Sequence, residues 1–144
     1  MTSNLFYRTL GDPSMPPLII LHGLLGTSDN WQTLGKAFSE HYCVWLIDQR
    51  NHGRSPHFET HQYADLADDL CTFMDEHEIE KAHVLGHSMG GKTALMFAHH
   101  HPDRLRKLIV ADMAVRAYEP HHQSIFDALL SAPIKAASER GEIE

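Results

Sequence analysis

Ser88 stands between two glycines in the segment Gly86-His87-Ser88-Met89-Gly90. The spacing Gly-x-Ser-x-Gly is typical of a serine nucleophile held on a sharp turn between a strand and a helix. Gly86 and Gly90 leave room where a side chain would collide with neighbouring backbone. A helix that begins after Ser88 directs its unpaired N–H groups and its positive dipole end toward a reacting carbonyl oxygen. These residues predict acyl-transfer chemistry at the Ser88 hydroxyl.

His22 and Gly23 open a second loop, which directly follows an apolar run. In this setting a backbone N–H of the loop completes an oxyanion hole with the N–H of the residue after the nucleophile. The expected donors are therefore Leu24 and Met89, and we expect His22 to order the loop. The alternative interpretation is a glycine-rich turn without a catalytic role.

The segment 86–93 also matches the letters of a phosphate-binding loop, Gly-x-x-x-x-Gly-Lys-Thr. This rival hypothesis implies a nucleotide-binding protein, with Ser88 as a helix N-cap. A phosphate loop usually follows the first strand of its domain, whereas this segment follows the third or fourth expected strand. The rival also leaves the His22-Gly23 loop unexplained, so the serine-nucleophile hypothesis is favoured.

Short apolar runs alternate with longer amphipathic segments, a pattern that predicts βαβ units. The fold class expected is α/β, with a mostly parallel sheet and helices on both faces. The expected buried strands are Leu18–Leu21, Cys43–Ile47, His83–Leu85 and Leu108–Ala111, with an edge strand in Asn4–Leu10. The expected helices are Trp31–Glu40, a segment from Tyr63 to Met74, one from near Met89 to His101, and one outside the sheet from Tyr118 to Leu130.

Composition narrows the classes of partner. Hydrophobic residues make up 42% and charged residues 22% of the 144 residues, which is ordinary for a globular protein. The net charge of −7 gives no electrostatic reason to bind nucleic acid or an anionic membrane. No run approaches the ~18 apolar residues of a membrane-spanning helix, and the N-terminus does not resemble a leader. We expect a cytoplasmic protein whose Cys43 and Cys71 are reduced.

Three segments, in their residues and their order, resemble the α/β-hydrolase superfamily. They are the His22-Gly23 loop, the segment 48–55 (Asp-Gln-Arg-Asn-His-Gly-Arg-Ser) and the segment 86–91. The stretch Arg-Asn-His-Gly-x-Ser is most similar to the YbfF-type esterase group and its mitochondrial abhydrolase relatives. The resemblance covers roughly residues 4 to 130. It implies an ester or thioester hydrolase that acts on small acyl substrates without a metal or organic cofactor.

The resemblance also implies roles for individual residues. Ser88 is the nucleophile, and Asp112, at the end of an expected strand, matches the triad acid; the alternative is that Asp112 only caps a turn. Asp48, Arg50 and His52 are expected to order their loop.

The resemblance further implies two parts, residues 1–117 as the N-terminal part of the hydrolase core and 118–144 as the beginning of a cap. The family's catalytic histidine lies after the last strand, and none of the 13 histidines here matches that position. His87 is adjacent to Ser88, but its side chain is not expected to reach the hydroxyl. We therefore expect low turnover from these 144 residues.

The histidine runs His99-His100-His101 and His121-His122 raise the question of a metal site. Consecutive helical residues do not face one another, and no cysteine or carboxylate completes a usual ligand spacing. The expectation is solvated histidines near a helix C-terminus and no metal.

Two functional hypotheses remain. The first is a serine esterase, weak or inactive in this form. The second is a non-catalytic binding or assembly module that associates through an exposed sheet edge at Leu108–Ala111.

Overall fold

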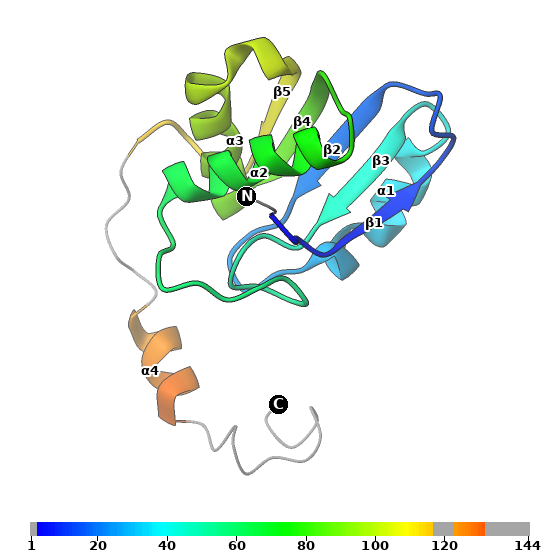
Figure 1. The fold of residues 1–144 in the computed structure, drawn as a ribbon. Helices are drawn as coiled ribbons and strands as arrows, with labels where there is room; N and C mark the ends of the chain where they lie inside the picture. Colours follow the sequence, from blue (N-terminus) through cyan, green and yellow to red (C-terminus); the bar gives the residue numbers. More distant parts are fainter. Residues whose placement is uncertain (1–2, 117–122, 132–144) are drawn as a thin grey trace.

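The computed structural model describes residues 3–116 and 123–131, and within them one sheet of five strands lies between helices (Figure 1). The strand order is β1-β3-β2-β4-β5, with β1 antiparallel to β3 and the other pairs parallel. The expected α/β class with a mostly parallel sheet is confirmed. The strands are β1 (Tyr7–Leu10), β2 (Pro17–Leu21), β3 (Cys43–Ile47), β4 (Ala82–His87) and β5 (Leu105–Ala111).

The helices cover both faces of the sheet because alternate residues of each central strand point to opposite sides. In β2, Ile19 and Leu21 pack with side chains of α2 and α3, whereas Leu18 and Ile20 pack with Phe38 at the end of α1. The helices are α1 (Gln32–Phe38), α2 (Tyr63–Glu76), α3 (Met89–His100) and α4 (Gln123–Ser131). One 3-10 turn, Ser28–Trp31, precedes α1, and another, Pro102–Arg104, follows α3.

The edge strands differ in part from expectation. β1 begins at Tyr7 rather than Asn4. β5 begins at Leu105, three residues earlier than expected, and is the edge of the sheet within the described residues. Leu108 packs against the α2–α3 side, but Ile109 is 49% exposed. The prediction that this whole run is buried is therefore wrong, whereas the exposed sheet edge expected at Leu108–Ala111 is present in the described residues.

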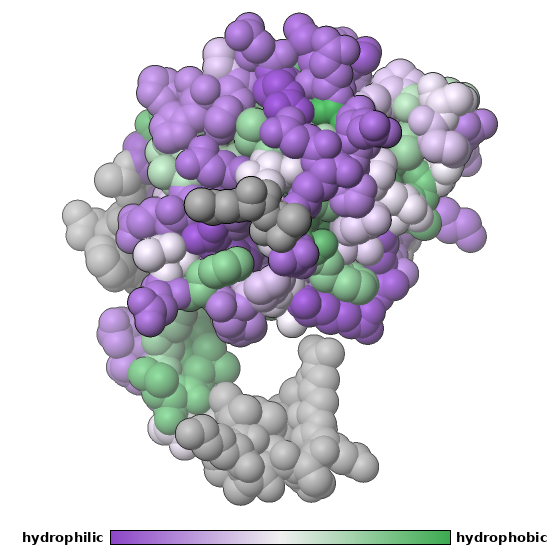
Figure 2. Space-filling model, in the orientation of Figure 1, coloured by the Kyte–Doolittle hydropathy of each residue, from purple (hydrophilic) through white to green (hydrophobic). Residues whose placement is uncertain are grey.

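Helix α4 lies apart from the sheet layers, as the sequence predicted (Figure 1). Apolar side chains gather on it, while most of the face seen in Figure 2 is hydrophilic. Its exposed apolar residues are Ile125, Phe126, Leu129 and Leu130. The expected helix start at Tyr118, the pair His121-His122 and the polar end from Ser138 lie outside the described residues, and the boundary at residues 117/118 stays a prediction.

Cys43 and Cys71 are both free, as expected. No helix in the described ranges is long and apolar enough to cross a bilayer.

Candidate active site

Ser88 occupies the turn between the last residue of β4 and the first residue of α3, with φ 52° and ψ −114°. A non-glycine residue in this backbone region costs on the order of 1–3 kcal/mol, which the surrounding structure must offset. One tie is the backbone N–H of Ser88, which donates to the carbonyl oxygen of Ala111 over 3.0 Å. The turn is thereby fixed to the end of the neighbouring strand β5.

The glycines on either side of Ser88 are required by backbone contacts. A Cβ atom at Gly86 would overlap the carbonyl group of Gly90, and one at Gly90 would overlap the carbonyl oxygens of Leu21 and His22. Neither set of atoms is a flexible side chain that could move aside. The strand β4, the loop after β2 and the start of α3 therefore meet at van der Waals distance only because both positions lack a side chain.

The loop after β2 forms a tight turn in which the N–H of Gly26 donates to the carbonyl oxygen of Gly23 over 3.0 Å. Leu24 and Leu25 are the central residues, so the turn's own hydrogen bond leaves their N–H groups unused. Leu25 has φ 60°. On the other side of the serine, Met89 is the first residue of α3, and its N–H has no acceptor within the helix. The backbone N–H groups of Leu24 and Met89, the two expected oxyanion donors, are therefore not used by the turn or by the helix to which they belong.

His22 is almost completely buried and holds two loops together. Its Nε2 atom accepts from the backbone N–H of Gln49 over 3.0 Å, and its Nδ1 atom lies 2.8 Å from the carbonyl oxygen of Gly23. The side-chain amide of Gln49 in turn donates to the carbonyl oxygen of His22 over 2.8 Å. Burial lowers the pKa of His22 below its ordinary value, so the ring is neutral. Since Nε2 must accept, the proton is on Nδ1 and is donated to Gly23.

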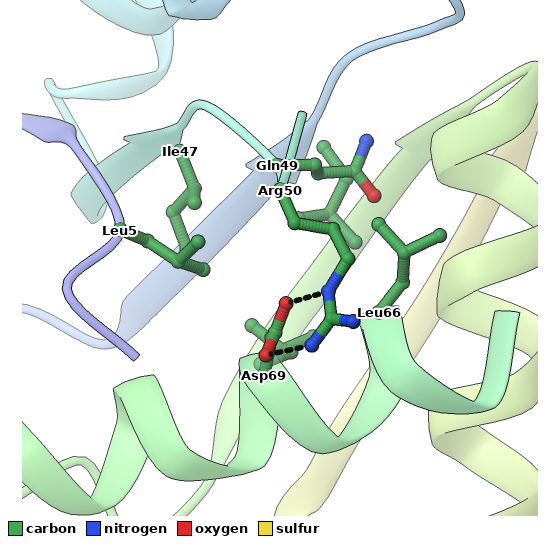
Figure 3. A pocket seen from close by; sticks show the side chains of 8 residues that line it. Leu5, Ile47, Gln49, Arg50, Leu66 and Asp69 are labelled. Atoms are coloured by element: carbon green, nitrogen blue, oxygen red, sulfur yellow. Dashed lines mark hydrogen bonds and ion pairs between the residues drawn. The ribbon is translucent and has the colours of Figure 1, made fainter. Parts of the chain in front are cut away.

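The loop after β3 is braced at both ends. The carboxylate of Asp48 accepts from the backbone N–H groups of Ser28 and Arg54. Arg50 donates two hydrogen bonds to Asp69 on α2, at 2.6 and 2.7 Å, as the dashed lines in Figure 3 show.

His52 Nδ1 lies 3.0 Å from the carbonyl oxygen of Arg50, and its ring is tilted against His22 with centroids 5.1 Å apart. These contacts are those of residues that order a loop.

A small cavity of about 10 Å³ lies between this loop and α2 (Figure 3). Its walls include Leu5, Ile47, Gln49, Arg50, Leu66 and Asp69. The Oε1 atom of Gln49 is buried, and within the described residues it has no hydrogen-bond partner. The sequence did not single out Gln49 as a site residue, because a single glutamine after a strand carries no signal until its partner loop is known.

An open pocket of about 220 Å³ lies over Ser88. Apolar side chains from the loop after β2 and from α4 form much of its wall. The lining residues are Gly23, Leu24, Leu25, His87, Ser88, Ile125 and Phe126. The sequence did not predict Ile125 or Phe126 here, since nothing in their local pattern shows that α4 lies opposite the elbow.

Asp112 directly follows β5 and has φ 55°. Its carboxylate is 88% exposed and lies 3.8 Å from Nε2 of His87. The structure therefore brings Ser88, His87 and Asp112 to the same edge of the sheet, where the parallel strands β4 and β5 end. In the part of the chain that the structure describes, the Ser88 hydroxyl has no hydrogen bond to a histidine or to any other group.

Comparison with known proteins decides the family. The family model for the alpha/beta hydrolase fold matches residues 16–138. The chain belongs to the α/β-hydrolase family.

Among relatives, a putative esterase/lipase of Haemophilus influenzae is 39% identical over 127 residues, which are 88% of this chain and 44% of that protein. Esterase YbfF of Escherichia coli is 36% identical over 114 residues, 78% of this chain and 45% of that protein. A solved structure of a marine microorganism esterase has a TM-score of 0.92 and 46% identity, and the match covers 97% of this chain and 56% of that one.

The resemblance to YbfF-type esterases is thereby confirmed, and this α/β-hydrolase chain spans less than half the length of these two relatives. The phosphate-loop hypothesis loses its support. Lys92, which would have to reach a phosphate, instead places its ammonium 5.7 Å from the centre of the Tyr63 ring on α2.

Proposed function

We propose that the protein is a serine esterase of the α/β-hydrolase family with Ser88 as its nucleophile. One observation carries the proposal. Ser88 is held at φ 52° on a turn that faces an open pocket, with the N-terminus of α3 directly behind it. A strained backbone that presents a hydroxyl to a pocket is difficult to explain as a purely structural feature.

The proposed reaction is acyl transfer through a covalent intermediate. Ser88 Oγ attacks the carbonyl carbon of an ester or thioester, and the N–H groups of Leu24 and Met89 stabilise the oxyanion. Collapse of the tetrahedral intermediate expels the alcohol or thiol and leaves an acyl-enzyme, which water then hydrolyses. No metal or organic cofactor enters these steps.

The proton that leaves Ser88 requires a general base. Asp112 is proposed as the acid that orients a histidine base, since it directly follows β5 beside the elbow and its exposed carboxylate is accessible to a partner. Within residues 3–116 and 123–131 no histidine is hydrogen bonded to Ser88. Slow turnover is therefore expected of these 144 residues.

The proposed substrates are small acyl esters or thioesters. Support comes from the pocket, in which Leu24, Leu25, Ile125 and Phe126 present apolar surface beside Ser88. Such walls suit an acyl chain and offer no charge for an anionic substrate.

The decisive measurement is hydrolysis of p-nitrophenyl acetate and butyrate by the 144-residue chain and by Ser88→Ala. Slow hydrolysis above the water background is expected, because the oxyanion hole stabilises the intermediate that Ser88 forms even though no histidine of the described residues is hydrogen bonded to it. Ser88→Ala should bring the rate to the background. Equal rates for the two proteins would remove the catalytic proposal.

A second candidate is a non-catalytic assembly module. It is supported by β5, which is the sheet edge in the described residues and carries the half-exposed Ile109. Unpaired strand edges with apolar side chains promote association between chains. Light scattering over a dilution series should then show oligomers that Ile109→Lys dissociates. A monomer at every concentration would exclude this function.

A further inference from the structure

Three metal-ligating side chains meet at the end of α3, away from the proposed active site. Asp68 on α2, His100 at the end of α3 and His101 directly after it offer ligand atoms that all lie within 4.8 Å of one another. We propose that these residues bind a divalent transition-metal ion, Zn²⁺ in particular, which links α2 to α3.

The position of His101 makes the cluster possible. Neighbouring histidines within a helix face apart, which is why the sequence predicts no metal site here. α3 ends at His100, however, and His101 has φ −129° and ψ 51°. The residue before a proline is pushed out of the α region, and Pro102 follows. His101 therefore leaves the helical spiral, and its ring can share a site with that of His100.

Two of the three ligands are already held in place. His101 Nε2 lies 3.0 Å from Oδ1 of Asp68. The His101 ring also packs on the buried Phe97 ring, with centroids 5.4 Å apart, and its backbone N–H donates to the Phe97 carbonyl oxygen. Such preorganisation reduces the conformational entropy lost when a ligand binds.

Charge also favours a cation at this place. Of the other aspartates on α2, two face Arg50 and Asp75 faces Arg104. Among the described residues, Asp68 forms no direct ion pair with either arginine, and its partner is His101. The C-terminal end of α3 adds the negative end of a helix dipole.

The donor set selects the ion. Two imidazole nitrogens and one carboxylate oxygen match the ligands of Zn²⁺, with bonds of about 2.0–2.2 Å and a water in the fourth position. All three side chains lie at the surface, so small rotations can bring the ligand atoms closer together. α3 has 12 residues, which places the cluster about 18 Å from Ser88 at 1.5 Å per residue. The ion would therefore stabilise the α2–α3 pair and take no part in ester cleavage.

The test is calorimetric titration of Zn²⁺ into the 144-residue chain, prepared without a polyhistidine tag and stripped with a chelator. We expect one site that Asp68→Asn and His100→Ala each weaken by at least about tenfold, because even indirect partners of metal ligands contribute that much. His99→Ala is the matched control, since His99 is a neighbouring exposed histidine outside the cluster. Its affinity should equal that of the unchanged chain.

A melting experiment supplies the second readout. Zn²⁺ should raise the Tm of the unchanged chain and of His99→Ala but not that of Asp68→Asn, because an ion that binds the folded state stabilises it. The proposal is overturned if no binding occurs, if His99→Ala weakens binding as much as His100→Ala, or if Asp68→Asn leaves the affinity unchanged. It is equally overturned if replacement of His121 and His122, rather than of the cluster, abolishes the site.

Discussion

The buried imidazole of His22 accepts a hydrogen bond from the backbone N–H of Gln49 over 3.0 Å. This contact joins the loop after β2, which contains the proposed oxyanion donor Leu24, to the loop after β3. It requires an unprotonated Nε2 atom, so the integrity of the proposed site depends on a neutral ring.

A pH dependence of stability follows from this contact. Burial lowers the pKa of His22 below 6.5 in the folded protein, and it does the same for His61 and His83. Between the lowered pKa and about 6.5 the unfolded chain binds more protons than the folded one, so the free energy of unfolding falls as pH falls through that range. Urea unfolding at pH 7.5 and 5.5 should show lower stability at pH 5.5.

The matched comparison is His22→Gln, whose side chain does not titrate. The loss of stability between pH 7.5 and 5.5 should be smaller in this variant than in the unchanged chain, with the remainder due to His61 and His83. An identical loss in both proteins would show that His22 is not responsible.

Gly90→Ala is expected to destabilise the fold by about 3 kcal/mol or more, because the new Cβ overlaps the carbonyl oxygens of Leu21 and His22. Gly91→Ala is the control. Its Cβ would lie 3.1 Å from a methyl group of Val110 and 3.2 Å from the Gly86 carbonyl oxygen and from Met113 Cβ, contacts that shifts of a few tenths of an ångström relieve, and alanine is the better helix former. Its effect should stay within about 1 kcal/mol in urea unfolding. Similar losses for both variants would contradict the steric account of the elbow.

Ser88→Gly should be more stable than Ser88→Ala by about 1 kcal/mol. The backbone at φ 52° is strained for alanine and not for glycine, and this difference exceeds the extra entropy that glycine loses on folding. Both variants lack the hydroxyl and should be equally inactive toward p-nitrophenyl esters. If alanine proves the more stable of the two, the turn is not strained.

Arg50→Lys should cost about 1–2 kcal/mol of stability, because lysine cannot reproduce the two parallel hydrogen bonds to Asp69 in a site where these side chains are only 11% and 14% exposed. Arg8→Lys is the control, since the Arg8–Asp29 pair is much more exposed and should lose no more than about 0.5 kcal/mol. Thermal or urea unfolding of both variants measures the difference. Equal costs would mean that the Arg50 brace contributes no more than a surface ion pair.

Local sequence patterns predicted most of the elements. β3 has the bounds expected of Cys43–Ile47, and α2 begins at the expected Tyr63. Proline stops α3 within one residue of the expected end. Edge strands were predicted less well, because pairing with one neighbour decides where they begin, and the apolar pattern of β5 does not reveal that Ile109 faces outward.

The sequence by itself determined that Ser88 would lie on a turn between strand and helix, since glycine spacing and hydrophobic period are local properties of the chain. Only the tertiary structure decided that Gln49 meets His22, that Phe126 lies opposite the elbow, and that Asp68 meets His101. His22 and Gln49 are 27 residues apart in the sequence, Ser88 and Phe126 are 38 apart, and Asp68 and His101 are 33 apart. Packing of the layers, rather than any repeat in the sequence, therefore brings each pair together.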